Sequence, residues 1–410
     1  MRRVAVSGIG ALCPLGNDVG TLFENARGGR SAVHRLDIPF ADRLAAALGA
    51  TTDFDPSAHL DKLESRMLDR YAQLARVAAD RAVADASGAL GALDPERAGV
   101  FLGTGMGGTL SMDEGYRTLY EEASDRINPF TVLLGMHNAA AAWIGMAHAL
   151  RGPALTYSSA CSSAAVAIGE AWARVARGEL DVALAGGSEA PLSPGSLKAW
   201  EALRTLATLD PDDPAASCRP FSRDRSGMVL GEGAAMLVLE PLERARARGA
   251  PLHGELLGCG LTNDATHITR PSVAGQAAAL MAALEAAGLS PDRVDAINAH
   301  GTGTPANDAT ETAAVRAVFG ERAERIPISA TKALHGHLLG AAGALECVLA
   351  LAAMRHAVAL PTMHLREPDP DCDLDYVPNA AREGVTARVT LSSSFAFGGT
   401  NAVLALGALD

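Results

Sequence analysis

Residues 154–171, which read ALTYSSACSSAAVAIGEA, contain the pattern that decides the fold. A short apolar run leads into a turn of small residues and then into a segment rich in Ala and Gly. Residues 326–346, IPISATKALHGHLLGAAGALE, repeat this order. Both expected helices are apolar on nearly every face, which indicates burial. Two buried helices, each with a reactive side chain at its N-terminus, favour a duplicated fold, although chance similarity of Ala-rich helices is an equal alternative.

The rest of the chain alternates short apolar runs with longer helical patterns, which is typical of a layered α/β protein. The expected strands cover residues 4–7, 99–103, 155–158, 181–185, 235–239, 294–298, 325–329 and 389–392. The expected helices cover residues 66–86, 162–177, 274–287, 309–319 and 340–356. No long low-complexity linker separates them, so we expect two halves packed against each other.

Bulk composition narrows the function classes. The 410 residues are 48% hydrophobic and 20% charged, which is ordinary for a soluble globular protein. The formal net charge of −12 argues against nucleic-acid binding, because affinity for phosphates comes from clustered Lys and Arg. The six cysteines are scattered without a CxxC pair. This spacing predicts neither a zinc site nor a disulfide framework, and it fits a reducing cytoplasm.

Two apolar stretches resemble targeting or membrane segments, but both are interrupted. The N-terminal MRRVAVSGIGALCPLG is broken by Gly8, Gly10 and Pro14 and lacks a small-x-small cleavage site. The run at 139–150 contains His148 and is too short to cross a bilayer. We therefore expect a cytoplasmic protein without a membrane segment.

Cys161 stands at the expected N-terminus of the first buried helix. The positive end of a helix dipole and its free N–H groups favour a thiolate there, which would make the side chain a nucleophile. The alternative is a cysteine that only fills space among small residues, and for this residue alone that alternative is the stronger one.

Three other segments offer reactive groups. His300 follows an expected strand in NAHGTGTP, where α/β proteins place functional loops. Lys332 and His337 share one turn before the second buried helix. The pair His335 and His337 has the His-x-His form of a metal site, but no carboxylate–histidine cluster accompanies it, and zinc needs three or four ligands. The fourth segment, SFAFGGTN at 394–401, has paired glycines that could present N–H groups.

Together these segments resemble the elongating branch of the β-ketoacyl-[acyl-carrier-protein] synthase family, including type II fatty-acid, polyketide and aryl-polyene ketosynthases. The resemblance runs through nearly the whole chain. It rests on GTGMGG at 103–108, RGPALTYSSACSS at 151–163, DVALAGGSEA at 181–190, NDATHIT at 263–269, AHGTGTP at 299–305, TKALHGHLLGAAGALE at 331–346 and FAFGGTN at 395–401.

The resemblance implies a thiolase fold, with two duplicated halves stacked in five α-β-α-β-α layers. We place the first half, which carries the nucleophile, at residues 1–250, and the second half, which carries the histidines and the lysine, at residues 251–410. It also implies acyl carrier protein as the substrate carrier and no cofactor or metal. The expected assembly is a homodimer, or a heterodimer with a chain-length-factor paralogue.

The family's site residues can be carried onto this sequence one by one. The catalytic triad falls on Cys161, His300 and His337, the family's lysine on Lys332, and its buried supporting glutamate on Glu346. The oxyanion and gating segment falls on Phe395, Phe397 and Gly398, with backbone N–H donors at Cys161 and Phe397. Contacts to the phosphopantetheine arm and the acyl chain fall on Thr302, Thr304, Thr269, Met106 and Trp200. For the last two, ordinary core packing is an equal alternative.

Carrier-protein docking would involve Arg66, Arg70, Arg126 and Arg204, each of which could equally be a solvated surface arginine. Ala396 in the gating segment, and Ser162 and Ala164 after the nucleophile, depart from the commonest elongation pattern. We take these departures to favour a specialised polyketide or aryl-polyene system over housekeeping fatty-acid elongation.

Other readings of the sequence stay open to test. A degradative thiolase would carry a second cysteine near the C-terminus, where this chain has FAFGGTN. A non-catalytic chain-length-factor subunit would lack Cys161. A papain-like hydrolase would explain neither Lys332 nor the glycine loops.

Overall fold

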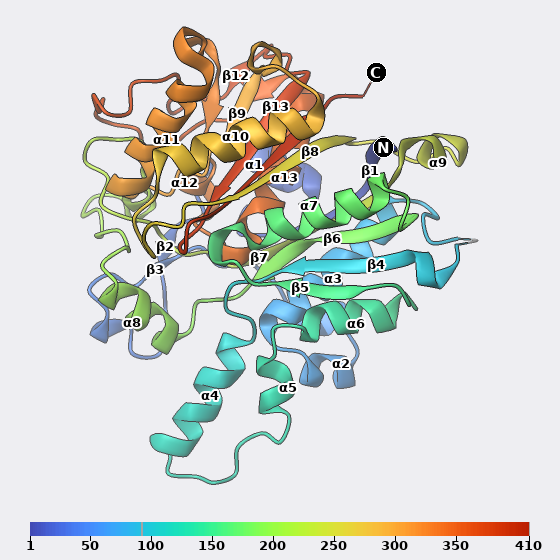
Figure 1. The fold of residues 1–410 in the computed structure, drawn as a ribbon. Coiled ribbons are helices and arrows are strands. Elements are labelled where there is room, and N and C mark those ends of the chain that lie inside the picture. The colour runs from blue at the N-terminus through green and yellow to red at the C-terminus, as the bar shows by residue number, and fades with distance from the viewer. Residues whose placement is uncertain (92, 410) are drawn as a thin grey trace.

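The computed structural model describes residues 1–91 and 93–409, which form one ten-stranded mixed sheet with helices on its faces (Figure 1). The strands of the first half are β1 (Val4–Leu12), β4 (Ala98–Gly103), β5 (Ala154–Tyr157), β6 (Val182–Glu189) and β7 (Gly233–Pro241). The strands of the second half are β8 (Gly254–Asn263), β9 (Ala296–Asn298), β10 (Ile328–Ser329), β13 (Val389–Phe395) and β14 (Thr400–Gly407). Two small ribbons pair β2 (His34–Arg35) with β3 (Leu48–Gly49) and β11 (Val358–Ala359) with β12 (Arg382–Glu383).

The two halves of the sheet have the same topology. The order is β5-β4-β6-β7-β1 in the first half and β10-β9-β13-β14-β8 in the second. In each half the outer three strands are parallel and the inner pairs are antiparallel. β1 and β8 join the halves antiparallel, with Val4 opposite Leu256. The duplication is therefore confirmed, whereas the boundary at residue 250 stays a prediction.

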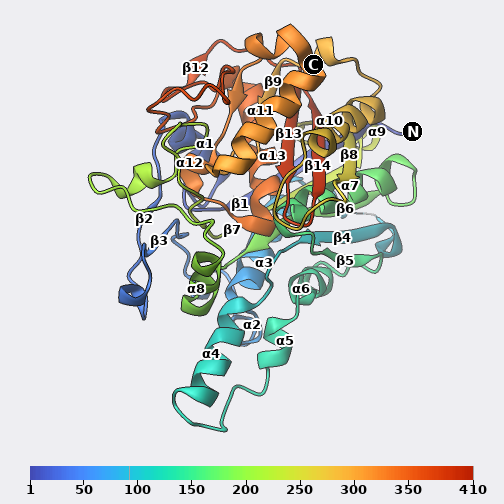
Figure 2. The same ribbon diagram turned by 60° about the vertical axis from the view of Figure 1, so that its left-hand side comes forward.

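The helices complete five layers. The first half contributes α1 (Val19–Arg27), α2 (Lys62–Met67), α3 (Arg70–Asp85), α4 (Thr109–Tyr120), α5 (Thr131–Gly135), α6 (Ala139–Ala147), α7 (Ser163–Ala176), α8 (Pro194–Ala202) and α9 (Leu242–Ala247). The second contributes α10 (Val273–Ala287), α11 (Pro305–Phe319), α12 (Lys332–His335) and α13 (Ala342–His356). The apolar helices α7 and α13 form the central layer between the two half-sheets. α3 and α6 cover the outer face of the first, and α10 and α11 that of the second (Figures 1 and 2).

The helix expected at 66–86 and the unpredicted strand β8 show how local features made the sequence prediction differ from the structure. The expected helix at 66–86 breaks into α2 and α3, because Leu68 is extended and Asp69 caps α3 by accepting the N–H of Tyr71. β8 was not predicted because its glycines resemble a turn. A Cβ at Gly260 would lie 2.2 Å from the carbonyl oxygen of Ala279 in α10, so these glycines permit close helix packing within a strand.

One stretch of the described chain, Leu339–His356, has the length and hydropathy of a membrane span. Of these residues 78% are buried inside the protein, as expected for the core helix α13.

Candidate active site

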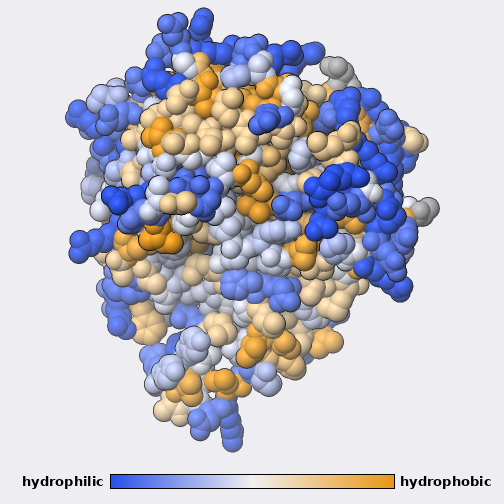
Figure 3. Space-filling view, viewed as in Figure 1, coloured by the Kyte–Doolittle hydropathy of each residue, from blue (hydrophilic) through white to orange (hydrophobic). Residues whose placement is uncertain are grey.

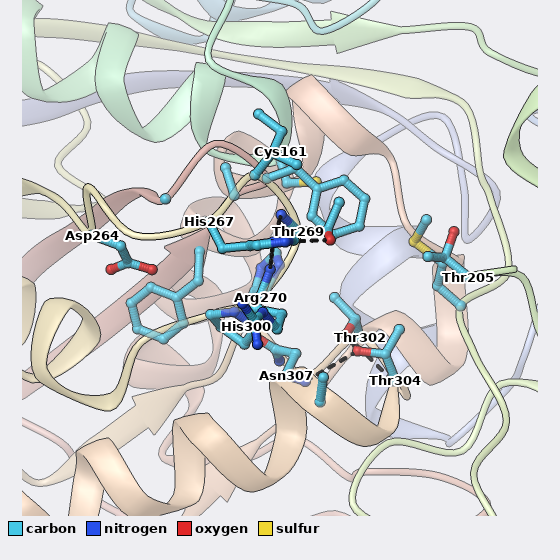
Figure 4. Close-up of a pocket in the computed structure, with 18 of the residues that line it drawn as sticks. Cys161, Thr205, Asp264, His267, Thr269, Arg270, His300, Thr302, Thr304 and Asn307 are labelled. Atoms are coloured by element: carbon cyan, nitrogen blue, oxygen red, sulfur yellow. Dashed lines mark hydrogen bonds between the residues drawn. The ribbon is translucent and has the colours of Figure 1, made fainter. Parts of the chain in front are cut away.

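The carboxyl ends of parallel strands bring the predicted site residues together. β5 leads through a 3-10 turn, Ala160–Ser162, to α7 and places Cys161 there. β9 ends just before His300, and β10 leads through α12 to His337. The turn between β13 and β14 adds Phe395 and Phe397. These side chains line one cavity of about 190 Å³ (Figure 4).

The three residues of the predicted triad lie in contact range. The Sγ atom of Cys161 and one ring nitrogen each of His300 and His337 all lie within 4.8 Å of one another. All three side chains are buried. Ala160, just before the cysteine, has φ of 52°, a left-handed conformation that non-glycine residues adopt at a cost of about 1–3 kcal/mol. The chain turns at Ala160, and the next residue, Cys161, lines the cavity.

The environment of the Cys161 thiol corrects one expectation. Burial raises its pKa to about 12, although the positive charge of Lys332 and a hydrogen bond from the Phe397 N–H oppose that shift. The nearby carboxylates of Glu189 and Glu346 raise it further. The prediction of a lowered pKa from the helix N-terminus alone was therefore wrong, because desolvation exceeds the helix dipole here. The resting side chain is a thiol.

Hydrogen bonds assign the tautomers of both histidines. Burial, followed by the charge of Lys332, holds the pKa of His300 and of His337 well below the usual range, so both rings are neutral. Nδ1 of His337 accepts the N–H of Leu339 at 3.1 Å. Nδ1 of His300 lies 3.4 Å from the ammonium of Lys332. A neutral ring that accepts at Nδ1 carries its proton on Nε2, so both residues offer Nε2–H donors. The Nε2 atom of His337 is buried and has no hydrogen-bond partner among the residues that the structure describes.

The same tautomers bear on metal binding. Cys161, His300 and His337 have the composition of a three-ligand site, with His300 rather than His335 as the second histidine. His335 is held away by Thr331 and the Gly336 carbonyl oxygen. In His337 one ring nitrogen accepts a backbone N–H and the other bears the proton, so neither lone pair is free for a metal. The arrangement suits hydrogen-bond donation better than coordination.

Lys332 lies at the centre of a buried polar network. Its ammonium donates to the carbonyl oxygen of His300 at 2.5 Å and to the carboxylate of Glu346, and it contacts Nδ1 of His300. Burial raises the pKa of Glu346 to about 7. The three protons of the ammonium thus meet three acceptors, which are the carbonyl oxygen and Nδ1 of His300 and the carboxylate of Glu346. Lys332 and Glu346 hold His300 without lining the cavity.

Two further buried glutamates were missed by the sequence analysis. Glu311 accepts the N–H groups of His300 at 2.7 Å and of Gly301 at 2.9 Å. Glu189 accepts the N–H groups of Gly105, Met106 and Gly340. Burial raises the pKa of each to about 7. The sequence signal of Glu189 was a carboxylate inside the apolar and glycine-rich segment DVALAGGSEA, which is uncommon without a partner, whereas Glu311 lies in the polar stretch PANDATETAAV and gave no such signal.

The three predicted threonines are brought to the cavity, whereas their contact with a phosphopantetheine arm stays a prediction. Thr302, Thr304 and Thr269 all line the cavity, and the first two hydroxyl groups lie 2.9 Å apart. Thr304 also caps α11. Figure 4 shows His267 and Arg270 on the same loop as Thr269. Those two residues were not predicted, because an exposed loop carries no periodic signal.

The residues expected at the acyl chain lie beside the cavity and do not line it. Met106 and Trp200 pack in the apolar cluster that contains Cys161. The Trp200 indole N–H lies 3.5 Å from the Met106 sulfur, and its ring stacks on Phe397 at 6.1 Å. Phe395 meets His300 edge-on at 6.0 Å. Gly398, in a left-handed conformation, donates its N–H to the Ile268 carbonyl oxygen and so fixes the turn.

The four predicted docking arginines separate into two groups. Arg66, Arg126 and Arg204 are exposed, and Arg204 follows Leu203, which lines the cavity. Arg70 instead donates to both oxygens of the buried Glu232 and to the carbonyl oxygen of Thr52. Its guanidinium is therefore committed to an internal ion pair, which makes it unsuitable as a docking residue.

Comparison with known proteins gives a consistent result. The chain matches the model of the β-ketoacyl synthase N-terminal domain over residues 1–245 and that of the C-terminal domain over residues 253–366. It is 46% identical to nodulation protein E of Rhizobium meliloti (strain 1021) over 404 residues, which covers 98% of each chain. It is 40% identical to 3-oxoacyl-[acyl-carrier-protein] synthase 2 of Staphylococcus aureus (strain COL) over 409 residues, 98% of this chain and 97% of that one.

Among solved structures, the ishigamide ketosynthase/chain length factor superposes with a TM-score of 0.93 at 33% identity and covers both chains fully. The predicted thiolase-type α/β fold is confirmed by this likeness and by the duplicated sheet. The chain belongs to the β-ketoacyl synthase family, a family of acyltransferases.

Proposed function

We propose that this ketosynthase takes an acyl group onto Cys161 and condenses it with malonyl-acyl carrier protein, releasing carbon dioxide. One observation carries the proposal: a buried thiol and two Nε2–H donors face the same cavity, with a backbone N–H at the thiol. This set matches a covalent intermediate and an enolate, which are the two species that the reaction must stabilise.

In the first half-reaction the Cys161 sulfur attacks the thioester carbonyl of the acyl-carrier protein. The new C–S bond forms as the bond to the carrier sulfur breaks, and the thiol proton leaves with the carrier thiol. The backbone N–H groups of Cys161 and Phe397 stabilise the oxyanion of the tetrahedral intermediate.

In the second half-reaction the malonyl thioester carbonyl accepts hydrogen bonds from His300 and His337. The bond to the carboxylate breaks, carbon dioxide leaves, and the electron pair forms an enolate. Its α-carbon attacks the acyl-Cys161 carbonyl, and the C–S bond breaks to release the thiolate, which takes a proton from water to restore the thiol. Neutral imidazoles suit this role, because their Nε2–H groups donate without giving up a proton. Lys332 orients His300, and Glu346 balances its charge.

The phosphopantetheine arm of the substrate would lie against the threonines of the cavity. Thr302, Thr304 and Thr269 supply hydroxyl groups for the amides of a phosphopantetheine arm. Arg66, Arg126 and Arg204 would meet the acidic carrier protein. The related staphylococcal enzyme is named for this carrier. A cytoplasmic location, where carrier proteins are found, stays a prediction.

A partner subunit is supported by an exposed apolar surface. α4 and α5 project from the body, and Figure 3 shows apolar side chains at this lower end. The exposed residues there are Tyr116, Tyr120, Ile127, Phe130, Val132, Leu133 and Met136. Apolar patches of this kind mark interfaces. We expect a homodimer or a heterodimer with a chain-length-factor paralogue, the second subunit in the name of the ishigamide structure.

We further infer a specialised polyketide or aryl-polyene substrate rather than a housekeeping fatty acid. Phe397 lines the cavity beside Cys161, and Trp200 stacks on it from behind and contacts Met106, so an aromatic pair backs this side of the cavity. A stiff unsaturated chain has few rotamers to lose in such a space. The test is a competition between saturated and polyenoyl carrier proteins of equal length. If the saturated chain is elongated faster, both with and without a paralogue, the enzyme would be assigned to fatty-acid synthesis instead.

The main proposal is tested with purified enzyme, acyl-carrier protein and malonyl-carrier protein. We expect a covalent acyl adduct on the Cys161 peptide, followed by carbon dioxide and β-ketoacyl product in equal amounts once the malonyl substrate is added. A degradative thiolase would instead transfer the acyl group to coenzyme A without decarboxylation, and a chain-length-factor subunit would form no adduct.

A further inference from the structure

Glu189 ends β6 as a fully buried carboxylate whose contacts go entirely to hydrogen-bond donors. Its Oε1 atom accepts the Thr104 hydroxyl and the Met106 N–H, both at 3.0 Å. Its Oε2 atom accepts the N–H of Gly105 at 2.6 Å and of Gly340 at 2.9 Å. None of the ion pairs found in residues 1–91 and 93–409 involves it. Four donors thus use the four lone-pair positions of one carboxylate.

These donors come from two loops in different halves of the molecule. The loop after β4 contains Met106, which contacts Trp200 beside the nucleophile. Gly340 belongs to the 3-10 turn that follows His337. The two backbones touch, because a Cβ at Gly340 would lie 2.2 Å from the Gly105 nitrogen and 2.7 Å from Glu189 Oε2. Glu189 is therefore the shared acceptor at a contact that leaves no room for a side chain.

An amide cannot replace this carboxylate. The NH₂ group of Gln would face two of the four donors, leaving them buried without an acceptor, which costs about 1–3 kcal/mol for each group. The carboxylate also acts on the nucleophile, since its negative charge raises the pKa of Cys161. The other groups that face this thiol are Lys332, Glu346, His300 and His337.

We propose that Glu189 is a positioning residue that fixes the Met106 loop, which supports Trp200 and through it the cavity residue Phe397, to the turn after His337, and so sets acyl-chain selectivity together with condensation. The inference rests on the proposed function of the site and adds a residue outside its cavity. Because one carboxylate holds both loops, a change in Glu189 alters the fit of the acyl chain and the geometry of the His337 donor together.

The experiment compares Glu189→Gln, Glu189→Asp and Glu240→Gln with the wild type. Glu240 is a matched control, because it is fully buried but bonded to Arg244 and Arg248 away from the site. Each protein is given acetyl, hexanoyl and dodecanoyl carrier proteins, and kcat/KM is measured for each donor. Carbon dioxide release and the pH profile of Cys161 alkylation are recorded in parallel.

For Glu189→Gln we expect the selectivity between acyl donors and the condensation rate each to fall about tenfold, which corresponds to about 1.4 kcal/mol. Alkylation of Cys161 should shift to lower pH, because a nearby negative charge is lost. Glu189→Asp keeps the charge, so its alkylation profile should match the wild type while its selectivity falls. Glu240→Gln should change none of these quantities.

A lowered melting temperature with unchanged selectivity and an unchanged alkylation profile in both Glu189 variants would assign Glu189 a purely structural role and overturn the proposal. If Glu189→Gln does not fold, Glu189→Asp decides alone, since wild-type selectivity in that variant would contradict the inference. Failure of the proposed function is distinguishable, because the wild-type enzyme would then form no acyl adduct on Cys161.

Discussion

The turn before each central helix begins with a left-handed residue in both halves of the molecule, Ala160 before α7 and Leu339 before α13. The next residue differs in chemistry. It is Cys161 in the first half and Gly340 in the second, where its N–H is bound by Glu189. The two halves therefore share the left-handed turn before the central helix. Only the first half has a nucleophilic side chain, Cys161, directly after it.

The loops that follow β4 and β9, which are equivalent strands of the two halves, also share a backbone feature but differ in reactive side chains. After β4 the N–H groups of Gly105 and Met106 are held by Glu189, and after β9 those of His300 and Gly301 are held by Glu311. A buried carboxylate fixes the loop in both halves, but only the second loop carries a reactive ring. The first half therefore supplies the nucleophile, and the second supplies the donors and the charge.

The largest effect is expected from removing the nucleophile. Cys161→Ala should abolish acyl transfer, because no other cysteine among the described residues lines the cavity. Intact-protein mass spectrometry after incubation with acyl-carrier protein measures the adduct. Cys259→Ala serves as control and should acylate normally. An adduct on the Cys161→Ala protein would place the nucleophile elsewhere and end the proposed division between the halves.

Removing either donor of the second half should separate the two half-reactions. We expect His300→Ala and His337→Ala to keep much of the self-acylation of Cys161 but to lose on the order of a hundredfold or more in decarboxylation of malonyl-carrier protein, as for other lost oxyanion donors. Release of carbon dioxide is the measurement. His335→Ala is the control, since that ring points away from the cavity. Normal release in both variants would contradict the donor roles.

The positive charge of Lys332, in the second half, should lower the pKa of the Cys161 thiol in the first half. Because the Cys161 pKa is raised to about 12, its alkylation by iodoacetamide should rise about tenfold per pH unit between pH 7 and 10 without a plateau. Lys332→Met removes the cation that lowers this pKa, so alkylation at pH 8 should slow about tenfold. Lys198→Met, an exposed lysine on α8, is the control. A plateau near pH 7 would show that the thiolate is stabilised at rest.

Substitution of Gly340, which occupies in the second half the position of Cys161 in the first, should lower the stability of the fold. A Cβ at Gly340 would lie 2.6 Å from the Thr104 carbonyl carbon, so Gly340→Ala should cost about 1–3 kcal/mol of folding free energy. Chemical denaturation measures the loss. Gly288→Ala is informative beside it, because that glycine has open space but φ of 66° and therefore tests strain alone. Equal stability of Gly340→Ala and wild type would show that the two loops can separate.

The smallest effect is expected at the surface. Arg66→Glu should raise the KM for carrier protein a few-fold at low ionic strength and leave kcat for small thioesters unchanged, because rim charges act on association and are screened by salt. Arg70→Glu should instead lower stability, since it breaks the buried pair with Glu232. An unchanged KM for Arg66→Glu would remove that residue from the docking surface.

Several elements could be predicted from sequence because their signals are local. The apolar helices α7 and α13 and the strands β1, β4, β6 and β7 follow periodicity, and all were expected. β8 and β14 were missed, because Gly258 and Gly260 serve packing against α10 and because β14 directly follows a glycine turn. The helical region at 66–86 was predicted whole, since its break depends on the cap at Asp69.

The sequence by itself determined the residue types of the site: one cysteine before a buried helix, His300 after a strand, and Lys332 with His337 in one turn. Only the tertiary structure decided their chemical state. Burial raises the pKa of Cys161 where the helix position had predicted the opposite, and the Leu339 N–H with Lys332 decides which nitrogen of each histidine donates. Ionisation and tautomer depend on desolvation and on groups distant in the chain, which no local pattern contains.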